Sequence, residues 1–150
     1  MNHQHLAQIN ISKMKFSIDS PKMQGFILNL DRINALADAQ PGFVWRLKGE
    51  TNNATEIQVF DDTQFIINMS VWTSVETLKE YVFRTAHVEI MRQRRQWFKL
   101  MDEANYVLWW IPAGHIPTLQ EAKEKLEYLR KNGPSAEAFD FKYCEQSAGE

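Results

Sequence analysis

One stripe of a predicted helix carries the residues of this chain that are best suited to chemistry. Phe83, His87, Met91, Arg94 and Phe98 recur three or four residues apart, which places them on one helix face. An imidazole ordinarily titrates near neutral pH and so suits proton transfer, and its neutral form can ligate iron. We therefore predict His87 as the catalytic acid or base. A purely structural helix histidine and a haem ligand are the alternatives.

A second polar group shares a sheet face with aromatic rings. Asn68 and Trp72 lie on the predicted strand 64–72 and Arg46 on the strand 43–47, and strand residues alternate between two faces. A few fixed polar groups among aromatic rings can orient a planar ligand and steady an oxyanion. The alternative is that they hydrogen-bond across a dimer interface. The predicted ligand-binding residues are Arg46, Asn68, Trp72, Arg84, Met91 and Trp97.

Other kinds of site are not indicated. The chain has a single cysteine, Cys144, which excludes an internal disulfide and a cysteine-based zinc site. His3 and His5 have no acidic residue close by in the sequence, so no metal site is predicted. The chain has 17 Lys and Arg against 19 Asp and Glu, a balance that argues against nucleic-acid and membrane-surface partners. The longest apolar run is only residues 107–111, and no targeting signal is visible, so a cytoplasmic location is expected.

The elements that position these residues follow from periodicity and capping signals. Strands are predicted at 6–12, 43–47, 64–72 and 105–112, and helices at 20–40, 74–104 (with a possible break near residue 85) and 118–133. This order predicts an α+β, ferredoxin-like β-α-β-β-α-β antiparallel sheet with a C-terminal helix. The 150 residues are predicted to form a single domain, 1–150, whose tail is weakly structured from about residue 142, although 139–143 could add an edge strand. The irregular segment 48–63 is either a lid or a variable hairpin.

The two predicted sheet faces differ in polarity. One is wholly apolar, as expected of a face under helices, and includes Ile9, Met69 and Trp109. The other mixes Trp72 and Trp110 with polar residues, and carries too many large apolar groups to remain exposed to water. We expect a second copy of the chain to cover this mixed face, which predicts a homodimer. Cover by the C-terminal helix or tail of the same chain is the alternative.

Several stretches resemble a known family. The chain is similar to a bacterial domain-of-unknown-function family in five stretches: "HLAQINISKMK", "GFILNLDRINALADAQPGFVWRL", "NMSVWTSVETLKEYVFRTAHVEIMRQRRQWF", "LWWIPAGHIPTLQEAKEKLEYLRKNGP" and "AFDF". The resemblance covers almost the whole chain and places it in the dimeric α+β-barrel superfamily, beside antibiotic-biosynthesis-monooxygenase-like proteins. It implies ferredoxin-like monomers whose sheets pair into a barrel.

The resemblance implies several functions for a small-molecule site. The superfamily includes cofactor-independent monooxygenases, haem-binding and haem-degrading enzymes, polyketide cyclases and proteins that only bind ligands. Its shared phrase, a strand ending in Trp followed by a capped helix and a His, places His87 at an iron-binding or acid–base position. Our first expectation is a monooxygenase-like enzyme without cofactor that acts on an aromatic or polyketide-like substrate. The alternatives are a non-enzymatic dimeric small-molecule-binding protein and a haem protein with His87 as ligand, in which Arg84, Arg94 and Arg95 would face the propionates.

Overall fold

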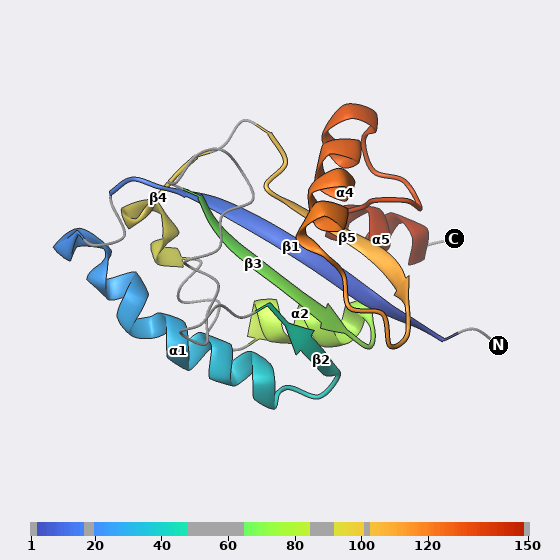
Figure 1. The fold of residues 1–150 in the computed structure, drawn as a ribbon, viewed down its shortest axis with the longest axis horizontal. Helices are drawn as coiled ribbons and strands as arrows, with labels where there is room; N and C mark the ends of the chain where they lie inside the picture. The colour runs from blue at the N-terminus through green and yellow to red at the C-terminus, as the bar shows by residue number, and fades with distance from the viewer. Residues whose placement is uncertain (1–2, 17–19, 48–64, 85–91, 101–102, 149–150) are drawn as a thin grey trace.

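The computed structural model describes residues 3–16, 20–47, 65–84, 92–100 and 103–148 and contains one antiparallel sheet. Its strands are β1 (Gln4–Met14), β2 (Phe43–Arg46), β3 (Phe65–Trp72), β4 (Phe98–Lys99) and β5 (Tyr106–Pro112). β1 is central: β3 pairs along one edge, β5 and the short β4 share the other, and β2 lies outside β3. Helix α1 (Gln24–Ala39) lies between β1 and β2 in the chain, and helix α2 (Val75–Arg84) follows β3 (Figure 1). The predicted α+β, ferredoxin-like fold is confirmed, with β5 as its fourth strand.

The helix boundaries follow from the capping residues. The hydroxyl of Ser20 accepts a hydrogen bond from the backbone N–H of Lys22 at 3.2 Å, in the short 3-10 turn that leads into α1. Thr118 caps α4 (Leu119–Asn132) in the same way, because its Oγ1 accepts from the N–H of Glu121 at 3.1 Å. The predicted starts of both helices are confirmed.

The predicted helical segment 74–104, with its possible break near residue 85, is wrong in its last part, after Gln93. α2 ends at Arg84, residues 85–91 lie outside the described residues, and a 3-10 turn at Arg94–Gln96 leads into β4. Trp97 is buried against Phe26 of α1 at a ring-centroid distance of 5.8 Å, and its carbonyl accepts a 2.7 Å hydrogen bond from the N–H of Lys15. Tertiary packing and strand pairing therefore override the helical pattern of this segment.

The C-terminal segment is more ordered than expected. The edge strand considered at 139–143 is reduced to one bridge, in which the backbones of Phe139 and Leu108 exchange hydrogen bonds at 2.8 and 2.9 Å. Helix α5 (Phe141–Ala148) then occupies the tail that was predicted to be weakly structured. The side chains of Phe139 and Tyr143 pack against each other, which joins α5 to the segment that bridges to β5.

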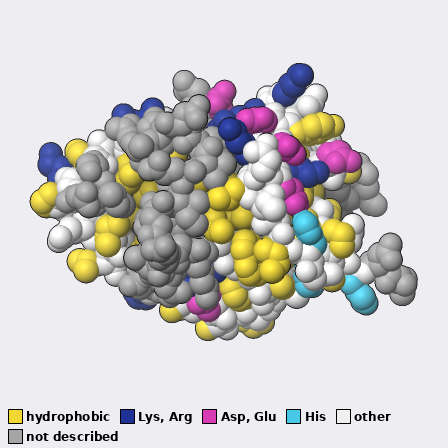
Figure 2. Space-filling view, in the orientation of Figure 1, with side chains coloured by type: hydrophobic (Ala, Val, Ile, Leu, Met, Phe, Trp, Pro, Cys, Tyr) yellow, Lys and Arg dark blue, Asp and Glu magenta, His cyan; other side chains and the backbone are white. Residues whose placement is uncertain are grey.

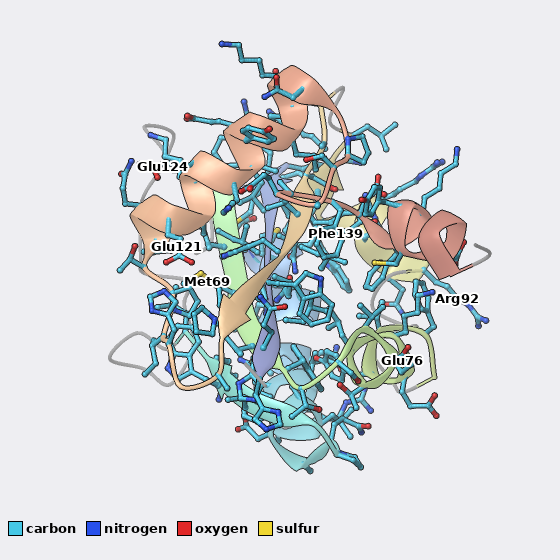
Figure 3. All side chains as sticks on the ribbon, turned by 90° about the vertical axis from the view of Figure 1, so that its right-hand side faces the viewer. Met69, Glu76, Arg92, Glu121, Glu124 and Phe139 are labelled. Atoms are coloured by element: carbon cyan, nitrogen blue, oxygen red, sulfur yellow. The ribbon has the colours of Figure 1, made fainter. Side chains whose placement is uncertain are left out.

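The helices cover the two sheet faces in the opposite way to the prediction. The apolar face, including Ile9, Met69 and Trp109, packs against α4. The mixed face, including Trp72, lies under α1, α2 and Phe139. In Figure 1, α1 runs along one side of the strands and α4 lies on the other, and Figure 3 shows Met69 on the α4 side and Phe139 toward α5.

This arrangement removes the reason for expecting a partner on the mixed face. Trp72 is fully buried within one chain, and Trp110 keeps 39% of its surface exposed while its ring packs 6.2 Å from that of Phe139. The alternation of side chains along the strands shows that a sheet face must be buried, but it does not show which element buries it. The homodimer stays a prediction.

The described surface has mixed charge. Figure 2 shows Lys and Arg side chains interspersed with Asp and Glu over α4, where Lys125 pairs with Glu137 at 3.3 Å. No helix in the described part of the chain is long and apolar enough to cross a membrane.

Candidate functional site

A cavity of about 390 Å³ lies between the mixed sheet face and helices α1 and α2. Strand residues Gln8, Asn10, Asn68 and Ser70 line one side, and α1 lines the other. This volume lies in the range of pockets for small organic molecules. The cavity is therefore under the helices of one chain, a location that the sequence left open.

Polar side chains on the strands form a connected row across the cavity wall. The amide Nε2 of Gln8 donates to Asn68 Oδ1 at 2.8 Å and to Ser70 Oγ at 2.7 Å, and Asn10 Nδ2 donates to Gln8 Oε1 at 3.1 Å. The β1–β3 register explains the row, because it places Gln8 opposite Ser70 and Asn10 opposite Asn68. These bonds hold Asn68 with its oxygen occupied, and its amide N–H groups have no acceptor among the described residues.

One face of α1 forms the opposite wall. Phe26, Asn29, Leu30, Ile33 and Asn34 line the cavity, at the three- and four-residue spacing of a single helix face. At 1.5 Å rise per residue, the lined stretch is about 12 Å long. The cavity is thus elongated along the helix and suits a molecule of two or three rings.

Two arginines lie toward opposite ends of this stretch. Arg46 is 5% exposed, lies opposite Ser70 in the β2–β3 register, and donates to Asp38 of α1 at 2.8 and 3.3 Å. Arg94 lies just before β4, which pairs with the far end of β1 at Lys13 and Met14. The described lining contains no Asp or Glu, so its charged groups are both cationic.

Two tyrosines contribute hydroxyl groups. Tyr81 stacks on Trp72 with ring centroids 5.3 Å apart and donates to the carbonyl of Ile33 at 3.2 Å, and its burial raises its pKa well above the ordinary tyrosine value. Burial also raises the pKa of Tyr106, whose oxygen accepts a 3.2 Å bond from the N–H of Phe141. Both phenols therefore stay protonated near neutral pH, where they donate hydrogen bonds rather than accept protons.

Aromatic rings close the cavity. Phe141, the first residue of α5, packs against Phe83 of α2 and Tyr106 of β5 at centroid distances of 5.6 and 5.7 Å. Phe26 and Phe98 pack edge to face at 5.0 Å toward the Arg94 end. The described lining thus combines flat apolar surfaces with a row of side-chain amides.

The structure brings only some of the predicted site residues to this cavity. Arg46 and Asn68 line it, whereas Trp72 and Trp97 are not among its lining residues. Trp72 lies beside Ser70, to which its indole N–H donates at 2.9 Å, and Trp97 packs against the first turn of α1 at Phe26 and Gly25.

The remaining predicted residues cannot be placed at the cavity. His87 and Met91 lie outside the described residues, as does the side chain of Arg84. The described lining offers no imidazole, thiolate or thioether to an iron atom, and no group of three or more metal-binding side chains occurs in the described ranges. Haem ligation by His87 therefore stays a prediction.

Sequence reasoning missed Asn34, Tyr81 and Phe141. Asn34 lies four residues after Leu30 and three before Ala37, so a polar residue interrupts the apolar stripe of α1. That interruption was the available signal for Asn34. The long-range approach of α5 had none, because it depends on how the C-terminal segment crosses β5.

Several solved structures are similar to this chain at low sequence identity. No curated protein matches the chain. Among solved structures, it is similar to SnoaB, a cofactor-independent oxygenase from Streptomyces nogalater, at 15% identity over 77% of this chain and 97% of that one, with a TM-score of 0.47. A putative antibiotic biosynthesis monooxygenase from Nitrosomonas europaea matches at 9% identity over 77% and 93%, with a TM-score of 0.47. A dabb family protein with a ferredoxin-like fold from Mesorhizobium loti matches at 14% identity over 77% and 98%, with a TM-score of 0.45.

The family comparison covers nearly the whole sequence. Residues 5–150 match the family described as Domain of unknown function (DUF3291). The expected membership of a domain-of-unknown-function family is confirmed: the chain belongs to the DUF3291 family.

Proposed function

We propose that this protein binds an aromatic or polyketide-like molecule with oxygen substituents, and that it acts on it as a cofactor-independent, monooxygenase-like enzyme. The observation that carries the proposal is the composition of the cavity, in which phenylalanine rings face a hydrogen-bonded row of side-chain amides. Flat rings pack against the apolar surfaces, and the polar groups orient the oxygen atoms of the ligand.

Asn68 and Arg46 have the chemistry to stabilise a substrate anion. The oxygen of Asn68 already accepts from Gln8 at 2.8 Å, which leaves its N–H groups to donate to a ligand oxyanion. Arg46 is held in place by Asp38, which balances its charge, and it presents a fixed guanidinium at one end of the cavity. A phenol or enol that loses a proton here becomes electron-rich enough to react with O2. The substrate supplies all four electrons: its O–H and one ring C–H hydrogen are lost as that ring carbon becomes a carbonyl, so one oxygen atom of O2 enters the product and the other leaves as water.

The proton acceptor in this scheme is His87, the residue predicted from the sequence. Tyr81 and Tyr106 are unsuitable as bases because burial raises the pKa of both. The described lining offers no carboxylate for this role. The lack of a carboxylate base in the described lining also favours the second candidate function, a protein that binds the molecule without transforming it.

Oxygen uptake with a panel of quinols and flavonoids tests the proposal. The wild-type protein is expected to consume O2 with at least one compound, and Asn68→Leu and His87→Ala are each expected to slow turnover by about 10²-fold or more. Lys131→Ala, on the exposed side of α4, is the matched surface control. Binding without oxygen uptake establishes the non-enzymatic alternative, and no binding to any compound refutes the proposal.

A haem titration tests the third candidate function, that of a haem protein. A Soret band that develops with the wild-type protein and disappears in His87→Ala would identify a haem protein instead. The homodimer is part of the same proposal and is measured by light scattering, where a monomer mass contradicts it.

A further inference from the structure

Asn34 is an unusual residue for the middle of a helix. It lies in the interior of α1, where asparagine is a poor helix former, and it is only 6% exposed. It also lines the cavity. A buried polar side chain normally has a hydrogen-bond partner, because leaving one unpaired carries a free-energy cost.

The carboxamide of Asn34 has no hydrogen-bond partner among the described residues. Other helical asparagines bond to their own helix: Asn29 Nδ2 donates to the carbonyl of Gly25 at 2.7 Å, and Asn132 Nδ2 donates to that of Tyr128 at 3.1 Å. No such bond reaches the Leu30 carbonyl, one turn before Asn34. The donor and acceptor atoms of Asn34 are therefore available to a molecule in the cavity.

The position of Asn34 identifies the end of the cavity that it serves. Asp38, one helical turn further along α1, holds Arg46 through bonds of 2.8 and 3.3 Å. The neighbouring residue Ile33 accepts the hydroxyl of Tyr81. Asn34 thus belongs to the Arg46 end, where Asp38 balances the arginine charge. The carboxamide of Asn34 is itself uncharged, so a neutral polar group suits it beside the balanced Arg46–Asp38 pair, while the oxyanion of the proposed reaction lies at Asn68.

We infer that Asn34 is a specificity-determining residue that hydrogen-bonds a neutral hydroxyl or carbonyl group at the Arg46 end of an aromatic ligand. The inference deepens the proposed function and rests on it, since it assigns the substrate class as ring systems with a neutral oxygen substituent at one end. A carboxamide suits both groups, because it donates to a carbonyl and accepts from a hydroxyl. Among the described residues, the fully buried side-chain polar atoms without a partner are those of His5 and Arg130, so the polar atoms of Asn34 keep contact with water in the cavity, and a ligand group would replace that water.

Three ligands that share one ring system test the assignment: naphthalene, 1-naphthol and 1-naphthoate, titrated calorimetrically into wild-type protein and Asn34→Leu. Leucine has a similar size and cannot hydrogen-bond. The variant is expected to bind 1-naphthol about five- to tenfold more weakly, and naphthalene and 1-naphthoate within about twofold of wild type. Unchanged 1-naphthol affinity, or a loss confined to 1-naphthoate, overturns the inference.

The free protein supplies a second readout. Asn34→Leu removes no hydrogen bond within the described structure and introduces a better helix former, so it is expected to raise the melting temperature by about 1–2 °C. Asn29→Leu on the same helix makes the same substitution but removes an existing bond to Gly25, so no such rise is expected. A lower melting temperature for Asn34→Leu would mean that Asn34 is a partnered structural residue, and would overturn the inference.

The two proposals fail in different ways. If the wild-type protein binds none of the ring compounds, the proposed function fails and the inference falls with it. If it binds 1-naphthol and Asn34→Leu binds it equally well, only the inference fails. Asn34→Ala repeats both measurements if the leucine variant does not fold, as judged by circular dichroism.

Discussion

Ser70→Ala is expected to destabilise this protein far more than the loss of one hydroxyl on a strand suggests. Ser70 Oγ accepts two hydrogen bonds, from Trp72 Nε1 at 2.9 Å and from Gln8 Nε2 at 2.7 Å. Trp72 is fully buried and Gln8 is 6% exposed, so water cannot replace the lost acceptor at the indole. The substitution therefore leaves a buried donor unpaired in the wall of the cavity.

The magnitude follows from the two bonds separately. The indole N–H of Trp72 has no other acceptor among the described residues, and an unpaired buried donor costs about 1–3 kcal/mol. Gln8 Nε2 keeps its 2.8 Å bond to Asn68, so it loses only one ordinary hydrogen bond, about 0.5–1.5 kcal/mol. The expected loss in the free energy of unfolding is about 1.5–4.5 kcal/mol in all.

Urea unfolding followed by circular dichroism measures this loss, with Ser12→Ala as the matched control. Ser12 lies on the same sheet face and also lines the cavity, but no side-chain hydrogen bond joins it to a described residue. Its replacement is expected to change the free energy of unfolding by less than about 0.5 kcal/mol.

A double-mutant cycle identifies the bond responsible. In a Trp72→Phe background there is no indole donor to leave unpaired, so Ser70→Ala is expected to cost only the bond from Gln8. The coupling between the two positions should then be about 1 kcal/mol or more. Equal effects of Ser70→Ala and Ser12→Ala, or additive effects in the cycle, would refute the reasoning.

Two further predictions concern a turn and a capped helix. Gly42→Ala is expected to cost clearly more stability than Gly114→Ala in urea unfolding: both glycines have positive φ (86° and 94°), but a Cβ at Gly42 would lie 2.4 Å from Thr77 Cγ2, while nothing lies within 4 Å at Gly114. Equal losses would contradict this steric explanation. At Glu121, burial acts to raise the pKa, but hydrogen bonds from His115 and Trp109 outweigh it and lower the pKa. A carboxylate with a lowered pKa stabilises the fold above its unfolded value of about 4.3, and this stabilisation is lost as the pH falls through the lower folded value. Glu121→Gln should therefore lose less stability than wild type between pH 5 and pH 3 in thermal melts, and parallel acid limbs would show that the contact contributes nothing.

The local features of this fold were predictable because they depend on neighbouring residues. Ser20 and Thr118 mark helix starts through hydrogen bonds to backbone groups two and three residues away. Alternating strand residues define two faces of the sheet before any tertiary contact is known. The element order then leaves few ways to pair the strands, and the ferredoxin-like arrangement follows.

The candidate site was only partly predictable. Arg46 and Asn68 were identified because polar residues on an otherwise aromatic strand face are conspicuous, and both line the cavity. Asn34 was not identified: it interrupts the apolar stripe of α1, but the sequence does not show that this helix covers the polar row of the sheet. The prediction of helix up to residue 104 also missed the 3-10 turn that places Arg94 just before β4.

The sequence by itself determined the elements, their order and the existence of two sheet faces that both require cover. Only the tertiary structure decided that α4 packs on the apolar face and that α1, α2 and the C-terminal segment cover the mixed one. The physical reason is that hydrophobic burial is non-directional: the side-chain pattern requires apolar surface to be removed from water, but any suitable apolar element can do so. Because α1 crosses the polar row on β1 and β3, a cavity lies there instead of a closed core.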